Sequence, residues 1–127
     1  MCIRDSCEHG ICGACTILVD GLPVRSCLML AVQVEGCDVQ TIEGLAGADG
    51  SFNELQSAFN HRFAAQCGYC TPGILMTLQH LKNQNRDFSE EEIRNALGGH
   101  ICRCTGYREI IDAAMDVMGA DSSQTED

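Results

Sequence analysis

Residues 7–15 of this 127-residue chain read Cys7-Glu8-His9-Gly10-Ile11-Cys12-Gly13-Ala14-Cys15. A further cysteine, Cys27, follows after a short gap. The C-x4-C-x2-C…C order is a spacing with which four thiolates hold a [2Fe–2S] cluster. The stretch therefore predicts that one such cluster binds to the following set: Cys7, Cys12, Cys15 and Cys27.

A second group of cysteines is formed by Cys67, Cys70, Cys102 and Cys104. Each of its two pairs immediately precedes a predicted helix. Helix N-termini present unpaired N–H groups and partial positive charge, so they favour an anionic thiolate–iron centre. These residues predict a second [2Fe–2S] cluster, whose ligands come from distant parts of the sequence.

Zinc binding and disulfide formation also stay open for the ten cysteines at this point. Four-thiolate sites suit zinc, and a cysteine-rich secreted chain can be a disulfide scaffold. Against these, C-x4-C-x2-C is not a usual zinc spacing, and Cys-x-Cys is a poor disulfide pair. Cys2 and Cys37 are left over and are expected to be free thiols. Solvated or packed positions, without metal-ligand spacing, are expected for the four histidines: His9, His61, His80 and His100.

Composition narrows the class of protein. The formal net charge is -10, and only 5% of the residues are aromatic. Such acidity argues against nucleic acid and against an anionic membrane surface, and no apolar run has the length of a membrane-spanning helix. Signatures of a catalytic triad, a phosphate loop or a nicotinamide site are also missing from the sequence. We therefore interpret the chain as one that passes electrons between partners.

The first half predicts strands. Residues 16–20 are rich in β-forming residues and end at Asp20-Gly21, a hairpin-turn signal. The chain returns along residues 23–26, and residues 38–42 alternate as a half-buried strand does. Residues 44–50 contain three glycines and predict a linker.

The second half predicts four helices. The second helix has Thr71 as N-cap and Pro72 at its first position. The third, over residues 90–97, begins with a capping box at Ser89, and the fourth begins at Thr105. Buried faces are expected for three sets of apolar residues: Leu55, Ala58, Phe59 and Phe63; Ile74, Leu75, Leu78 and Leu81; and Ile111, Ala114, Met115 and Met118.

Three segments resemble the small iron–sulfur subunit of the molybdenum hydroxylases, the xanthine oxidase superfamily. Besides residues 7–16, they are Gln66-Cys67-Gly68-Tyr69-Cys70-Thr71-Pro72-Gly73 and Ile101-Cys102-Arg103-Cys104-Thr105-Gly106-Tyr107. Residues 26–36, with Thr41-Ile42-Glu43-Gly44-Leu45, look most like the small chain of aerobic carbon monoxide dehydrogenase.

The resemblance implies an α+β fold with two [2Fe–2S] domains. A plant-type ferredoxin β-grasp is expected over residues 1–46 and an all-α four-helix domain over residues 51–118, with a disordered acidic tail at 119–127. Family chains place two strands and a helix before the first cluster cysteine, where this chain has six residues. The ferredoxin domain is therefore expected to be truncated, with residues 1–6 foreign to it and its strands left without a covering helix.

The resemblance also implies partners. These are a large subunit with a molybdopterin cofactor, where substrate is oxidised, and a medium subunit with FAD. Electrons would cross the helical-domain cluster and then the ferredoxin-domain cluster on their way to FAD. By resemblance, Gln66 contacts the pterin and Cys104 lies beside it, whereas the loop of residues 7–15 faces the flavin. His100 stands where the family usually has asparagine.

We therefore expect the iron–sulfur, electron-transfer subunit of a cytoplasmic molybdenum hydroxylase that oxidises carbon monoxide or a small organic substrate. Two alternatives are a stand-alone two-cluster ferredoxin and a zinc-stabilised interaction module. Absence of co-purifying large and medium chains would favour the first alternative, whereas Gln66 argues against it. Colour would exclude the second, because zinc sites are colourless.

Overall fold

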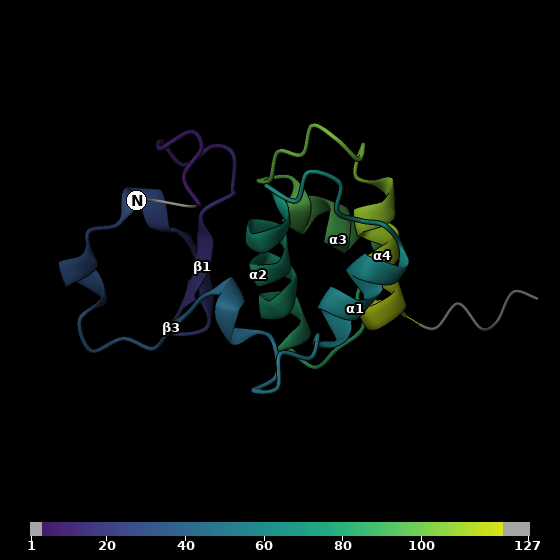
Figure 1. The fold of residues 1–127 in the computed structure, drawn as a ribbon, viewed down its shortest axis with the longest axis horizontal. Helices are drawn as coiled ribbons and strands as arrows, with labels where there is room; N and C mark the ends of the chain where they lie inside the picture. Colours follow the sequence, from purple (N-terminus) through teal and green to yellow (C-terminus); the bar gives the residue numbers. More distant parts are fainter. Residues whose placement is uncertain (1–3, 121–127) are drawn as a thin grey trace, which may run out of the picture.

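The computed structural model describes residues 4–120. Cys2 and most of the expected acidic tail fall in residues 1–3 and 121–127, which lie outside the described residues. Figure 1 shows a small sheet with its loops on one side and a group of helices on the other, with α2 (Thr71–Lys82) between them. Strands precede helices along the chain, as the sequence predicts.

Three short strands form the sheet: β1 (Thr16–Val19), β2 (Leu22–Arg25) and β3 (Val39–Gln40). β1 lies in the centre and pairs antiparallel with both neighbours. The predicted hairpin turn is confirmed, because Asp20 and Gly21 have φ values of 49° and 79°, as a tight turn of this kind requires. The 3-10 helices η1 (Ser26–Leu28) and η2 (Ala31–Val34) lead on to β3. β3 is shorter than predicted, since η3 (Ile42–Gly44) begins at Ile42.

The remaining helices are α1 (Glu54–His61), α3 (Glu90–Leu97) and α4 (Arg108–Met118). The predicted capping box of α3 is confirmed: the Ser89 hydroxyl accepts the N–H of Glu92, and the Glu92 carboxylate accepts the N–H of Ser89. An equivalent box, formed by Asn53 and Gln56, begins α1. Both helices therefore begin at side chains that satisfy otherwise unpaired N–H groups.

Three helix predictions are wrong in detail. Phe63 does not belong to the buried face of α1, because the chain leaves the helix with φ 54° at this residue and its side chain is 79% exposed. Thr71 is not an N-cap; it lies inside α2, and Cys70 takes the N-cap position. α4 begins later than Thr105, after Tyr107, whose left-handed φ of 71° ends the preceding turn.

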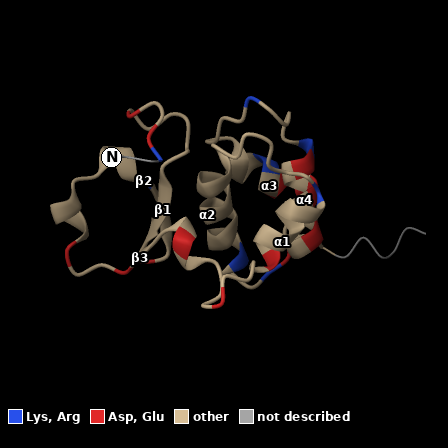
Figure 2. Cartoon of the chain, in the orientation of Figure 1, with Lys and Arg blue, Asp and Glu red and all other residues tan. Residues whose placement is uncertain are grey.

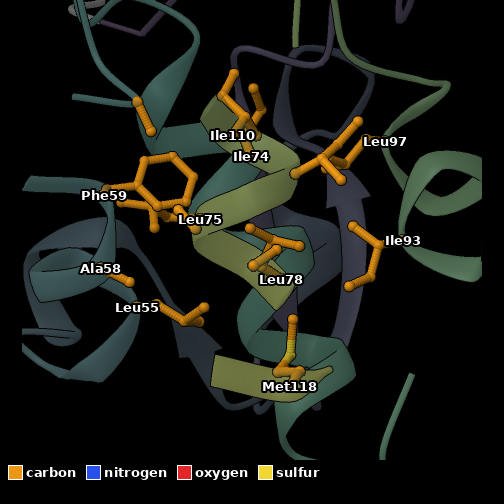
Figure 3. Close-up of a cluster of buried hydrophobic side chains, with 14 of the residues drawn as sticks. Leu55, Ala58, Phe59, Ile74, Leu75, Leu78, Ile93, Leu97, Ile110 and Met118 are labelled. Atoms are coloured by element: carbon orange, nitrogen blue, oxygen red, sulfur yellow. The ribbon is translucent and has the colours of Figure 1, made fainter. Parts of the chain in front are cut away.

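One hydrophobic core joins the sheet to the helices. α2 packs against β1 and β2 and also against α1 and α3. Leu18 of the sheet and Leu45 are both buried within this core. Figure 3 labels its helical part: Leu55, Ala58, Phe59, Ile74, Leu75, Leu78, Ile93, Leu97, Ile110 and Met118. Within the described residues 4–53 the sheet has no α-helix of its own, and α2 from the second half of the chain covers it instead. Residues 44–50 are not a plain linker, since Leu45 anchors them.

The surface differs between the two halves. Charged residues gather on α1, α3 and α4 (Figure 2). Ion pairs such as Arg62–Asp116 and Arg94–Glu90, each at 2.6 Å, connect helices or successive turns there. On the other half, Arg4 pairs with Glu43 at 2.8 Å, so the described part of residues 1–6 contacts the folded body. Within residues 4–120, no helix combines the length and apolar character needed to cross a membrane.

Candidate metal centres

The first cysteine group lies in the loop before β1 and in η1. Gly10 and Gly13 have φ values of 82° and 78°, which glycine adopts without strain. The loop thereby turns the N–H groups of Ile11 and Cys12 toward the sulfur of Cys7, at 3.4 Å each. Hydrogen bonds from N–H groups to sulfur are one means by which proteins tune iron–sulfur centres.

These N–H groups change the ionisation of Cys7. The N–H of Cys12 has the largest effect and that of His9 the next. With a contribution from Ile11 they outweigh partial burial and lower the pKa of Cys7 to about 6. A thiol with this pKa is largely ionised at neutral pH, and the thiolate is the form that ligates metal.

Cys15 and Cys27 form a close pair in the same group. The N–H of Cys27 donates to the Cys15 sulfur at 3.5 Å. Burial opposes ionisation of Cys15, but the N–H and thiol of Cys27 outweigh it and lower the pKa of Cys15. Burial, and then the Cys15 thiol, raise the pKa of Cys27. The Cys12 thiol is a further, smaller cause of the lowered pKa of Cys7, so the structure places Cys7 near Cys12 and Cys15 near Cys27.

The second group is assembled by the N-terminus of α2 and the turn before α4. Cys70 is buried, and burial followed by the nearby Cys102 thiol raises its pKa to about 12, with a smaller effect from Cys67. For Cys102, burial is outweighed by the hydroxyl and N–H of Thr105 and by the N–H of Cys104, so its pKa is lowered. The Thr105 hydroxyl oxygen lies 3.1 Å from the Cys102 sulfur.

Only one pair of this second group directly precedes a helix, which corrects the sequence prediction. Cys102 and Cys104 are separated from α4 by a turn that Tyr107 supports. The Tyr107 hydroxyl accepts the N–H of Cys102 and donates to the carbonyl of His100, both at 3.0 Å. Sequence reasoning assigned Tyr107 no role, because this contact depends on the shape of the whole turn.

One edge of the second group reaches the surface. Gln66, Cys67 and Cys104 are all exposed, whereas Cys70 is buried. The neighbouring apolar side chain of Ile101 is 55% exposed. The structure therefore presents both residues that the resemblance assigns to the pterin side, Gln66 and Cys104, to the outside of the chain.

The donor set fits a two-iron cluster. Within residues 4–120, no three His, Cys, Asp or Glu side chains converge as the ligands of one metal ion do. A [2Fe–2S] cluster instead distributes its four protein ligands over two irons. The thiol pairs of the first group, and the contact of Cys70 with Cys102 in the second, match that distribution. The N–H groups aimed at the sulfurs of Cys7 and Cys15 suit a negatively charged centre.

The two groups meet through their backbones. The N–H of Ile101, next to Cys102, donates to the carbonyl of Cys12 at 2.9 Å. His100 is buried beside this contact, with its Nε2 2.8 Å from the Thr77 hydroxyl of α2. Burial, and then the charge of Arg25, lower the pKa of His100 to about 4, so its ring is neutral at pH 7. His100 is thus a packed residue, as expected.

Comparison with known proteins matches residues 41–115 to a family described as the [2Fe-2S] binding domain. The chain is 54% identical over 114 residues to the caffeine dehydrogenase subunit gamma of Pseudomonas sp. (strain CBB1), covering 87% of this chain and 68% of that subunit. It is 42% identical over 116 residues to the xanthine dehydrogenase iron-sulfur-binding subunit of Escherichia coli O157:H7, covering 90% of this chain and 72% of that subunit.

A solved structure has the same fold. The crystal structure of quinoline 2-oxidoreductase from Pseudomonas putida 86 superimposes with a TM-score of 0.86 at 49% sequence identity. The match covers 90% of this chain and 70% of the chain in that structure. The likeness therefore extends over the sheet as well as the helices.

Proposed function

Because the chain belongs to the small iron–sulfur subunits of the molybdenum hydroxylases, the xanthine oxidase family, we propose that it carries two [2Fe–2S] clusters. The members of this family are electron-transfer subunits of oxidoreductase complexes. The observation that carries the proposal is the assembly of two separate thiol groups, one in the loop before β1 and in η1, the other at the N-terminus of α2 and in the turn before α4. When bound, a [2Fe–2S] cluster takes up and releases one electron at a time.

We assign the first cluster to Cys7, Cys12, Cys15 and Cys27, and the second to Cys67, Cys70, Cys102 and Cys104. The chain's own residues have two tasks. The N–H groups aimed at Cys7 and Cys15 stabilise negative charge on sulfur. The bond from Ile101 to the Cys12 carbonyl connects the two ligand loops directly. In this proposal residues 1–46 and 51–118 are the two cluster-binding units.

We further propose the orientation of this subunit between its partners. Gln66 and Cys104 would face the molybdopterin of a large subunit, which their exposure supports. The loop of residues 7–15 would face the FAD of a medium subunit. We keep a cytoplasmic location as a prediction for the complex.

For the substrate, the comparisons favour an organic compound. The relatives named above are a caffeine, a xanthine and a quinoline enzyme, and all three compounds are nitrogen heterocycles. We therefore propose that the complex hydroxylates a nitrogen heterocycle in its large subunit. Carbon monoxide, suggested by the likeness of residues 26–45, stays a prediction.

The test is cluster content combined with single cysteine variants. Loaded chain should contain about four iron and four sulfide, and should give two distinct EPR signals after reduction with dithionite. Cys27→Ser should remove one of these signals and Cys67→Ser the other, because each removes one ligand from one group.

Cys37→Ser is the matched control. The Cys37 thiol lies beside Asp20, which raises its pKa, and it belongs to neither group. This variant should keep both EPR signals. Zinc without sulfide in the purified chain, or loss of both signals in Cys37→Ser alone, would contradict the proposal.

A further inference from the structure

We propose that Arg25 is a positioning residue that holds the segment before Cys102 against the loop of the first cysteine group and so sets the separation of the two clusters. The inference rests on the proposed function, because it concerns the geometry between those two clusters. Neither sequence reasoning nor the family match assigns Arg25 a role.

Arg25 connects parts of the chain that are far apart in sequence. It ends β2, two residues before Cys27. Its Nη2 donates to the carbonyl of Gly99 at 2.7 Å, across 74 positions of sequence. Its Nη1 donates to the Thr16 hydroxyl at 2.6 Å, and that hydroxyl donates to the carbonyl of Gly13 at 2.7 Å. One guanidinium therefore reaches both sides of the junction between the cysteine groups.

Residues 99–100 approach the first cysteine loop and Arg25 closely, and this approach requires glycine, which has no Cβ, at positions 13 and 99. A Cβ at Gly99 would lie 2.7 Å from Nη2 of Arg25. A Cβ at Gly13 would lie 2.4 Å from Nδ1 of His100 and 2.7 Å from the Gly99 carbonyl. The Ile101 bond to Cys12 adjoins this contact. The segment 99–101 thus rests directly on the first cysteine loop, with Arg25 holding its start.

The bonding of Arg25 differs from that of the surface arginines. Arg62 and Arg94 pair with carboxylates. Among the described residues Arg25 has no carboxylate within ion-pair distance; its Nη1 and Nη2 donate to a hydroxyl and a carbonyl, and its buried Nε has no partner there. A planar guanidinium can bridge two such acceptors in fixed directions, whereas a lysine ammonium on a flexible stem cannot replace that geometry. This bonding suits a residue that holds two segments together, here called the Arg25 clamp, better than a residue that only adds surface charge.

Loosening the clamp should alter the relation between the clusters and leave each cluster intact. In Arg25→Gln, both EPR signals should remain, but the splitting that arises from coupling between the two reduced clusters should change, since dipolar coupling falls with the cube of distance. The amide of Ile101 should exchange with deuterium about tenfold faster, the factor that corresponds to about 1.4 kcal/mol of local stability.

Conservative variants distinguish the effect of the bridging hydrogen bonds of Arg25 from the effect of its positive charge. Arg25→Lys keeps the positive charge but should behave like Arg25→Gln, because one ammonium cannot bridge Gly99 and Thr16 in the same way. Thr16→Val should give part of the same effect, and Thr16→Ser, which keeps the hydroxyl, should restore the parent splitting. Arg62→Gln, which removes a charge paired with Asp116 elsewhere, is the control and should leave the splitting and the Ile101 exchange unchanged.

The outcomes distinguish this inference from the proposed function. Absence of iron and sulfide from the parent chain would defeat the proposed function and the inference with it. If Arg25→Gln kept the EPR splitting and the Ile101 exchange rate of the parent chain, the inference about Arg25 would be wrong, and the proposed function would still stand. A variant that lost either cluster altogether would also count against it, because a clamp between the groups should leave each set of four thiolates in place.

Discussion

At the scale of single residues, glycine positions show how tightly the two halves meet. Gly73 lies in the first turn of α2, and a Cβ there would be 2.1 Å from the carbonyl oxygen of Gly13 and 3.0 Å from that of Ala14. Both neighbours are backbone atoms and cannot move aside by changing rotamer. The helix backbone therefore rests on the first cysteine loop.

We expect Gly73→Ala to lower the free energy of unfolding by about 1–2 kcal/mol. Alanine favours a helix interior over glycine by about 1 kcal/mol, but the overlap with the Gly13 carbonyl must push α2 and the loop apart, at a cost typical of overpacking. Urea unfolding of parent and variant measures the difference.

Gly44→Ala is the matched control, because the nearest atom to its Cβ would be Cγ of Gln40 at 3.7 Å, an ordinary contact. Its effect should stay within about 0.5 kcal/mol. Equal stability of Gly73→Ala and Gly44→Ala would show that α2 does not press on the loop.

At the scale of elements, the beginnings of α2 and α3 differ although both carry a hydroxyl residue. Ser89 caps α3 through its hydroxyl, which accepts the N–H of Glu92 at 3.2 Å. Thr71 lies inside α2, and its buried hydroxyl has no hydrogen-bond partner among the described residues. Cys70 occupies the cap of α2 without a side-chain hydrogen bond, which leaves the N–H groups of this first turn without a side-chain cap beside the second cysteine group.

The two hydroxyls should respond in opposite ways to removal. Ser89→Ala should cost about 1 kcal/mol of stability because a cap is lost. Thr71→Val should be neutral or slightly stabilising because an unsatisfied buried hydroxyl is replaced by a methyl group of similar shape. Denaturant unfolding with cluster content held constant measures both, and a loss in Thr71→Val as large as that in Ser89→Ala would contradict this picture of α2.

At the scale of the whole molecule, stability should be uneven. Both β2 and β3 are edge strands, and the apolar side chains of Leu22, Leu28, Leu30 and Val32 are exposed around them. The helical half has most of the buried core (Figure 3) and most of the ion pairs. Short sheets with two free edges depend on what covers them, and here α2 is the cover.

We therefore predict slower hydrogen exchange in residues 51–118 than in residues 7–45. The amides of β1, which lie under α2 and between two strands, should be the best protected of the first half. Exchange followed by mass spectrometry on the cluster-loaded chain measures this. Equal protection of the two halves would contradict the prediction and show that they unfold as one unit.

Much of the candidate site could be predicted from sequence because its signals are local. The cysteine spacing of residues 7–15, the turn at Asp20-Gly21 and the capping box at Ser89 each involve only a few neighbouring residues, so the sequence reveals them directly. The structure confirms the turn and the box, and it brings together the thiols of the first group. The ligand assignment itself stays a proposal.

Other features were decided only by tertiary structure. Phe63 fits the helical period of α1 but is exposed, since the chain turns away before it. Leu45 falls in a glycine-rich stretch yet is buried in the core, because it directly follows η3, which packs against α2. The contact of residues 99–101 with Cys12 and Gly13 joins segments that no local pattern relates. Spacing along the chain predicts which residues can ligate, whereas the contacts of α2 and of residues 99–101 with the first cysteine loop, which join segments far apart in sequence, bring the two groups next to each other.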